Sequence, residues 1–388
     1  MFKVQTLSSI SPIIHEELDS ALFTAEKESV APDAILVRST DMLSMELPAS
    51  LLCVARAGAG YNNIPVDRCT EKGIVVFNTP GANANAVKEL AVAALLLASR
   101  EILAGIDWAK GLKGKGAEVP ALVEKGKNQF VGPELQGKTL GVLGLGAVGG
   151  PIANVATHLH MKVLGFDPFL SVENAWGLSR AVIRAQSQDA LIAQADYLTV
   201  HVPLNKETRG MIDETFLGKM KKGAVLINLS RGELVEPGAM KAALQSGQLR
   251  KYVVDFPSDE LLEVPGVISI PHLGASTPES EENCAQMAAA QTRDYLLYGS
   301  IRNSVNLPQI ELMAPEYHRV AVIHQNIPNM ISQIAQAVSD EGVNISNMAN
   351  RSRQSVAYSV LDLDSPLPGA AVRKLEGIEG VVRVRVIR

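Results

Sequence analysis

The stretch TLGVLGLGAVGG, residues 139–150, decides the fold of this 388-residue chain. Gly144, Gly146 and Gly149 form a GxGxxG pattern directly after an apolar strand, and a helix-forming stretch follows. The first glycine allows a tight turn, the second lets the backbone approach a pyrophosphate, and the third allows close packing of helix on strand. The pattern therefore predicts a dinucleotide site at a helix N-terminus, with a purely structural turn as the alternative.

An acidic residue ends the next apolar strand, MKVLGFD. Asp167 lies 18 residues after Gly149, where a carboxylate can accept hydrogen bonds from both ribose hydroxyls. A carboxylate would repel a 2′-phosphate and no arginine follows immediately, so NAD is favoured over NADP as the cofactor. A helix cap or turn residue is the alternative interpretation of Asp167.

Short apolar strands alternate with helix-forming stretches on both sides of the glycine turn. Upstream, AILVRS, LLCVARAG and IVVFNTP indicate βαβ units, and residues 111–137, rich in Gly, Lys and Pro, indicate a connection. Downstream, six candidate strands have the apolar content of a parallel sheet buried on both faces: KTLGVLGLG, MKVLGFDP, DYLTVHVP, AVLINLS, KYVVDFP and GVISIPH. We predict an α/β protein with two doubly wound, Rossmann-like parallel sheets.

Residues 318–388 have a different pattern. They alternate as strand, helix, strand, strand, helix and strand, which is the ferredoxin-like βαββαβ order. No chemistry-bearing cluster occurs in them, so we predict a binding or regulatory module.

Composition and length exclude several classes of function. With 47% hydrophobic residues, 20% charged residues and a net charge of −5, the chain has the composition of a globular protein of two or three domains. No basic patch indicates nucleic acid, and the longest apolar run, LAVAALLLAS, is about half of a membrane span. The N-terminus has no secretory signal, so we expect a cytoplasmic location.

Cys53, Cys69 and Cys284 are far apart, so we expect neither a disulfide nor a metal site.

Three side chains follow strands of the second predicted sheet and suit the oxidation of a 2-hydroxy acid. Arg231 follows AVLINLS and can bind a carboxylate bidentately, with a surface ion pair as the alternative. His272 follows GVISIP and is the best-placed base among the seven histidines. Asp255, after KYVV, is expected to face the nicotinamide carboxamide, and Asp259 and Glu260 are candidate acidic neighbours of His272.

Eight ordered motifs resemble the D-2-hydroxyacid dehydrogenase family across nearly all of residues 34–308. They are RAGAGYNNI, NTPGAN, VKELAVAALL, GLGAVG, HVPLNKETRGMI, NLSRGELV, VVDFPSDE and PHLGAST. The resemblance implies a discontinuous substrate-binding domain at 1–95 and 276–308, around an NAD-binding domain at 96–275. It extends to members that act on 3-phosphoglycerate, which makes this phosphorylated hydroxy acid the expected substrate.

The resemblance also implies roles for individual residues. Arg231 and His272 would be catalytic and would also contact the substrate and the cofactor. The implied cofactor contacts are Thr79, Gly144, Gly146, Ala147, Val148, Gly149, Asp167, His201, Val202, Pro203, Thr208, Leu229, Ser230, Asp255, Gly274 and Ala275. The implied substrate contacts are Arg56, Gly58, Ala59, Gly60 and Asn83, which Arg38 and Lys88 could assist.

One motif departs from the family pattern. The family places a glutamate five residues after the strand-ending aspartate, in a pattern like DVFxxEP, as the acid that pairs with the histidine. This chain has DFPSDELL, so that counting from Asp255 gives Glu260, whereas aligning the Phe-Pro pair gives Asp259. We expect Glu260 to be the catalytic acid.

The C-terminal 70 or so residues resemble an ACT domain, a module that senses amino acids. The stretches HQNIPNM and GVNISNM resemble its serine-sensing form, which implies L-serine as an effector held by His324, Asn326 and Asn344 across paired modules. A homodimer through the cofactor domains, or a homotetramer, is expected. The alternatives are a different D-2-hydroxy acid as substrate and a corepressor-like protein that senses dinucleotides.

Overall fold

The computed structural model describes residues 1–387, which form two compact units. One unit combines Met1–Asn83 with the chain from Pro278 onward, and the other is Ala84–Thr277. Helices α3 (Ala84–Ser99) and α11 (Pro278–Tyr298) begin at the two points where the chain passes between them. The assignment of substrate-binding and cofactor-binding domains remains a prediction.

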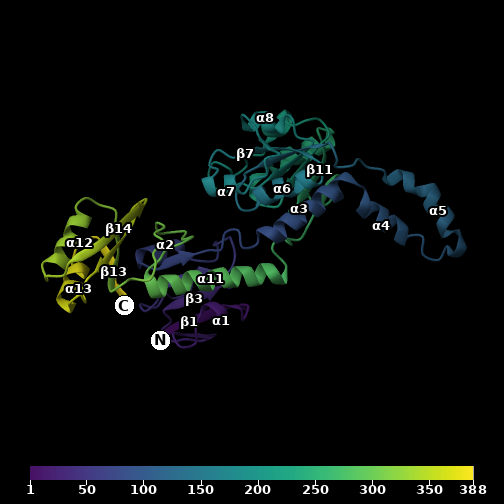
Figure 1. Ribbon diagram of the computed structural model, residues 1–388. Helices are drawn as coiled ribbons and strands as arrows, with labels where there is room; N and C mark the ends of the chain where they lie inside the picture. Colours follow the sequence, from purple (N-terminus) through teal and green to yellow (C-terminus); the bar gives the residue numbers. More distant parts are fainter. Residues whose placement is uncertain (388) are drawn as a thin grey trace. The chain divides into compact units, whose positions relative to one another are not determined.

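A five-stranded parallel sheet organises the first part of the first unit. Its strand order is β2-β1-β3-β4-β5, from β1 (Phe2–Leu7), β2 (Phe23–Glu26), β3 (Ala34–Val37), β4 (Cys53–Arg56) and β5 (Val75–Phe77). Helices α1 (Ile14–Glu17) and α11 cover one face, and α2 (Val66–Glu71) lies beside β5 (Figure 1). The three strands predicted here are confirmed, whereas β1 and β2 were not predicted.

A seven-stranded parallel sheet forms the core of the second unit. Its order is β12-β11-β10-β9-β6-β7-β8, from β6 (Thr139–Leu143), β7 (Lys162–Phe166), β8 (Val182–Arg184), β9 (Tyr197–Val200), β10 (Ala224–Asn228), β11 (Leu249–Val254) and β12 (Val267–Ser269). The six predicted strands are all present, and β8 is an additional edge strand. The strand order reverses between β6 and β9, which is where a doubly wound sheet binds its ligand.

Helices cover both faces of this sheet. They are α3, α6 (Gly149–His158), α7 (Val172–Trp176), α8 (Gln188–Ile192), α9 (Glu214–Lys219) and α10 (Pro237–Gln245), with the 3-10 turn η3 (Gly232–Leu234). Of the residues described, none forms a helix with the length and hydrophobicity of a membrane span.

The segment predicted as a connection is instead helical, so that prediction was wrong. Its elements are η1 (Gly116–Glu118), α5 (Val119–Gly126) and η2 (Lys127–Phe130). Helix α4 (Ile102–Lys110) precedes them, and α4 and α5 extend away from the seven-stranded sheet (Figure 1). Trp108 packs against Phe130, with ring centroids 5.5 Å apart. No residue of α4 or α5 is buried, and the many Gly and Lys residues of this segment led to the prediction of a connection.

The C-terminal part of the first unit is an antiparallel sheet with the predicted βαββαβ order. Its elements are β13 (His318–Gln325), α12 (Met330–Ser339), β14 (Ile345–Arg353), β15 (Val356–Leu363), α13 (Gly369–Glu376) and β16 (Val381–Ile387), in the sheet order β14-β15-β13-β16. Two helices cover one face of the sheet. The other face contributes Ala321, Ile323 and Tyr358 to the same core as α11.

Arginines of this C-terminal sheet hold the last turn of α11. Arg385 donates hydrogen bonds to the carbonyls of Tyr295 (3.2 Å) and Leu296 (3.0 Å), and its guanidinium lies 4.5 Å from the centre of the Tyr295 ring. Arg319 donates to the carbonyl of Tyr298 (2.7 Å). Because the last carbonyls of a helix have no partner within the helix, these guanidinium groups cap it.

Candidate active site

The glycine turn has the geometry of a phosphate cradle. Gly144 has φ +89°, and a Cβ there would lie 2.6 Å from the carbonyl oxygen of His201. A Cβ on Gly149 would lie 1.9 Å from the carbonyl oxygen of Gly144, so the start of α6 packs directly on the backbone of the glycine turn. A Cβ on Gly146 would meet nothing within 4 Å, which leaves open space in front of α6. No side chain caps α6 at Val148, so its first amides can bind a phosphate.

Asp167 ties the end of β7 to this turn. Its carboxylate accepts hydrogen bonds from the backbone N–H groups of Leu145 (2.9 Å) and Phe169 (2.8 Å). The side chain is half-buried, and each oxygen keeps a second lone pair for a ribose hydroxyl. The predicted ribose contact therefore has a fixed acceptor.

The loop after β9 carries four of the predicted cofactor contacts, His201, Val202, Pro203 and Thr208. The Thr208 hydroxyl donates to the carbonyl of Pro203 (2.6 Å), which closes the loop. Burial lowers the pKa of His201 to about 4, so its ring is neutral near pH 7. That ring lies 2.8 Å from the Thr199 hydroxyl.

The loop after β10 presents Arg231 and is fixed by an asparagine that the sequence analysis missed. Asn228 is fully buried, and its oxygen accepts hydrogen bonds from the N–H groups of Ser230 (3.1 Å) and Arg231 (3.3 Å). Its amide donates to the carbonyl of Arg231 (2.7 Å). A buried polar residue at the end of an apolar strand was the available signal.

The loop after β12 presents His272 in an uncommon backbone conformation. His272 has φ +53°, a left-handed value that a residue with a Cβ adopts only when its surroundings hold it there. The Asp255 carboxylate supplies that hold, because it accepts hydrogen bonds from the N–H groups of Leu273 (2.7 Å) and Gly274 (2.8 Å). Burial raises the pKa of Asp255, and these hydrogen bonds oppose the rise. Its predicted contact with the cofactor remains a prediction.

One aromatic ring lies against both predicted catalytic side chains. The Phe256 ring centre is 4.6 Å from that of the His272 imidazole and 5.9 Å from Cζ of Arg231. The cation and the base are therefore at the same edge of the sheet. Phe256 was not among the predicted site residues.

The predicted acid partner of His272 does not contact it in this structure. Glu260 and Asp259 are both exposed, in the loop between β11 and β12. Within residues 1–387, neither forms an ion pair or a hydrogen bond with the His272 ring. Glu260 as the catalytic acid remains a prediction.

The predicted substrate contacts Arg56, Gly58, Ala59, Gly60 and Asn83 lie in the first unit, mostly in the loop after β4. Nε of Arg56 donates to the Asn63 side chain (3.1 Å). Arg38 follows the neighbouring strand β3 and forms a 2.6 Å ion pair with Glu281 of α11. Two guanidinium groups thus lie at adjacent strand ends, since Val37 and Arg56 are paired in the sheet.

Thr79 was predicted to contact the cofactor, and in the structure it is fully buried in the first unit. Its N–H donates to the carbonyl of Gly58 (3.1 Å), so it braces the loop that carries the substrate contacts. Its cofactor contact remains a prediction.

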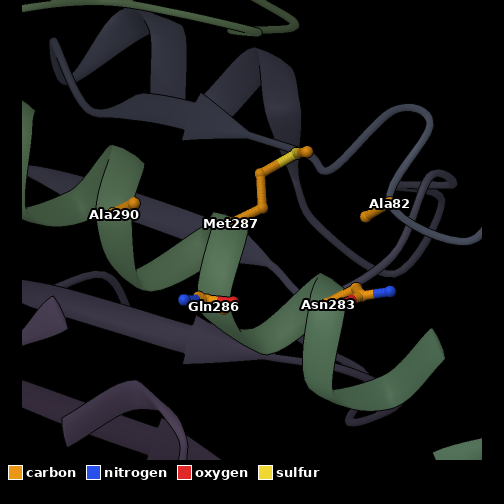
Figure 2. Close-up of a pocket in the computed structure, with 5 residues that line it drawn as sticks. All are labelled: Ala82, Asn283, Gln286, Met287 and Ala290. Carbon is orange, nitrogen blue, oxygen red and sulfur yellow. The ribbon is translucent and has the colours of Figure 1, made fainter. Parts of the chain in front are cut away.

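A hollow of about 410 Å³ lies on α11 beside the loop that leads to Asn83. Figure 2 shows Met287 of α11 pointing toward this loop, with Asn283 and Gln286 on neighbouring turns. None of the described residues that line the hollow is charged, so they do not provide a phosphate site.

The three predicted effector contacts fall at the two ends of the C-terminal sheet. His324 is buried and lies 2.9 Å from the Ser359 hydroxyl, and Asn326 follows it. Asn344 precedes β14 beside Asp364, near the end of the sheet where His318 pairs with Leu363. His318 and His324 are six residues apart on β13, which corresponds to about 20 Å. One chain therefore cannot bring all three residues to one small ligand.

Part of the chain is similar to proteins of known family. Residues 92–274 match the family described as D-isomer specific 2-hydroxyacid dehydrogenase, NAD binding domain. A D-3-phosphoglycerate dehydrogenase of Archaeoglobus fulgidus is 35% identical over 292 residues, which are 72% of this chain and 52% of that protein. The chain spans about half the length of the curated relatives it matches.

Two solved structures share the fold over most of the chain. A glyoxylate reductase from Paecilomyes thermophila has a TM-score of 0.64 and 27% identity, covering 78% of this chain and 98% of its own. An NAD+-bound 3-phosphoglycerate dehydrogenase of Entamoeba histolytica has a TM-score of 0.59 and 26% identity, covering 79% of this chain and 98% of its own. The glycine turn, Asp167, Arg231 and His272 all lie within the matched segment 92–274.

Proposed function

We propose that this chain is a D-isomer specific 2-hydroxyacid dehydrogenase that oxidises D-3-phosphoglycerate to 3-phosphohydroxypyruvate with NAD, since residues 92–274 match the NAD-binding domain of that family and 292 residues are 35% identical to a D-3-phosphoglycerate dehydrogenase. This reaction would open L-serine biosynthesis. The observation that carries the proposal is that Arg231 and His272 contact the same Phe256 ring. A carboxylate-binding cation and a proton acceptor thereby share one edge of the sheet.

Three residues have separate proposed roles in the reaction, His272, Arg231 and Glu260. The C2–H bond breaks and its hydride leaves, while the hydroxyl proton passes to the His272 imidazole. Arg231 binds the substrate carboxylate and polarises the forming C2 carbonyl. Glu260 is the proposed acid that stabilises the imidazolium, which requires its exposed side chain to turn toward His272. Bound NAD supplies the hydride acceptor.

The cofactor residues fit a dinucleotide. The open space at Gly146 and the uncapped first turn of α6 would hold the pyrophosphate through the amides near Ala147 and Val148. Asp167 would hold the adenosine ribose. The other proposed contacts are Thr79, Gly144, Gly149, His201, Val202, Pro203, Thr208, Leu229, Ser230, Asp255, Gly274 and Ala275.

Arg56 is the proposed phosphate ligand, since a guanidinium binds phosphate bidentately. Gly58, Ala59, Gly60 and Asn83 would bind the substrate through their loops. Arg38 would assist, and its ion pair with Glu281 gives it a carboxylate partner that a phosphate could replace.

A substrate panel tests the reaction. We expect NADH formation from D-3-phosphoglycerate, and we expect His272→Ala to abolish it while NADH binding, followed by fluorescence, is retained. Turnover of glyoxylate or another D-2-hydroxy acid in preference would favour the alternative suggested by the reductase likeness. NADH binding with no turnover of any hydroxy acid would contradict the enzyme proposal.

The C-terminal βαββαβ part is proposed to be an ACT domain that binds L-serine and inhibits the enzyme. His324 and Asn326 of one chain would act with Asn344 of a second chain, because these residues lie at opposite ends of one sheet. Calorimetry and initial rates with L-serine test this. Serine that neither binds nor slows the reaction at millimolar concentration would contradict it.

A homodimer is proposed through α4 and α5. Ile102, Leu103 and Ile106 are 41–48% exposed on a helix that buries no residue. A monomer rarely leaves such a patch uncovered, and a second copy would cover it. Sedimentation should show that Ile106→Asp weakens association. Ile183→Asp on the edge strand β8 is the matched control and should leave the oligomeric state unchanged. Pairing of the C-terminal parts could give a homotetramer.

A further inference from the structure

The sheet order places one residue between the two catalytic side chains. Strand β11 lies between β10 and β12, and the three strands run parallel. Arg231 follows β10, His272 follows β12, and Phe256 follows β11. Since neighbouring strands are about 4.8 Å apart, the side chain after β11 is within reach of both loops.

The contacts of the Phe256 ring agree with this position. Its centre lies 4.6 Å from the His272 ring, tilted by 49°, a separation typical of favourable aromatic pairs. Cζ of Arg231 is 5.9 Å from the same centre, at the outer limit of a cation–π contact. The ring also packs against the apolar cluster on this side of the sheet, which limits its own motion.

Phe256 is the residue that contacts both side chains, although Nη1 of Arg231 also donates a hydrogen bond to the carbonyl of Ser230 (2.7 Å). Both oxygens of Asp255 are engaged with the backbone of Leu273 and Gly274. In the part of the chain that the structure describes, the His272 imidazole has no ion pair or hydrogen bond. A Cβ on Gly232 would lie 3.2 Å from Cβ of Phe256, so Gly232 gives the aromatic side chain room beside the Arg231 loop.

We propose that Phe256 is a positioning residue, which holds the Arg231 guanidinium and the His272 imidazole against one ring so that both face the same substrate. The proposal rests on the proposed function for its catalytic consequence. It does not require Phe256 to touch substrate or cofactor. Loss of the aromatic ring should therefore lower kcat while the affinity for NADH stays unchanged.

A pair of matched substitutions tests the proposal. Phe256→Leu removes the ring and keeps an apolar side chain, and Phe216→Leu makes the same change in the same apolar cluster at a buried residue of α9. We expect Phe256→Leu to lower kcat about tenfold with an unchanged Kd for NADH, and Phe256→Tyr to restore most of the loss. Phe216→Leu should lower the melting temperature and leave kcat within about twofold. Equal kcat losses in the two leucine variants would overturn the proposal.

A second measurement does not depend on turnover. The imidazole proton resonances of His272, assigned in histidine-labelled protein with the help of His272→Gln, should sense the Phe256 ring at 4.6 Å. We expect Phe256→Leu to shift and broaden them, and Phe216→Leu to leave them in place. Unchanged resonances in Phe256→Leu would overturn the positioning role. If the resonances respond but the wild type turns over no hydroxy acid, the proposed function fails and the positioning role stands.

Discussion

Replacing Arg385 by methionine should loosen the C-terminal end of α11. The substitution keeps an unbranched apolar side chain but removes the hydrogen bonds to the Tyr295 and Leu296 carbonyls and the contact over the Tyr295 ring. Two hydrogen bonds from a charged donor and one cation–π contact together contribute about 4 kcal/mol. The methionine variant no longer has to bury a charged guanidinium, which offsets about 1 kcal/mol of this loss. The net loss of stabilising free energy at the end of α11 is therefore about 3 kcal/mol.

Amide hydrogen exchange measures this loss locally. A loss of about 3 kcal/mol raises the opening equilibrium about a hundredfold, so the last two turns of α11 should exchange about a hundred times faster. Arg383→Met is the matched control, because Arg383 lies on the same strand but donates to carbonyls of Ala49 and Leu51 instead of α11. Unchanged exchange in Arg385→Met, or an equal increase in α11 of Arg383→Met, would refute the assignment of Arg385 as the cap of α11.

Further predictions concern the second unit, residues 84–277. Gly146→Ala adds a Cβ to open space, so the melting temperature should stay within about 2 °C while the Kd for NADH rises at least about tenfold in a fluorescence titration; an unchanged Kd would contradict the phosphate cradle. Burial lowers the pKa of His201 to about 4, below the unfolded value of about 6.5. As the pH falls from 6.5 toward 4, the unfolded chain takes up a proton that the folded chain does not, so the free energy of unfolding falls by about 3 kcal/mol, whereas above pH 6.5 this loss is absent. Calorimetry should show a flatter stability profile in His201→Gln between these pH values, and an equally steep profile would exclude His201 as the cause.

Much of the second sheet could be predicted because its strands are buried on both faces. Strands β9 and β10 consist entirely of buried residues, which gives the continuous apolar runs seen in the sequence. Strand β1 has one fully buried residue and was missed, because a half-buried strand with polar alternation resembles any exposed terminus. Residues 111–137 were wrongly predicted as a connection because their Gly and Lys content is typical of loops, whereas the structure forms α5 there without burying any of its residues.

Only part of the proposed active site could be predicted, because the sequence does not show the order of the strands in the sheet. A sequence shows that Arg231, Asp255 and His272 each follow a strand, but not that β11 lies between the other two strands. Only that order makes Phe256 the shared neighbour of the cation and the base. The same order explains why Asp255 is engaged elsewhere, since the loop after the adjacent strand β12 brings two N–H groups onto its carboxylate. Where the family pattern leads one to expect a carboxylate beside the histidine, this chain places an aromatic ring, and the kcat of Phe256→Leu relative to Phe216→Leu measures how far that ring orients the base.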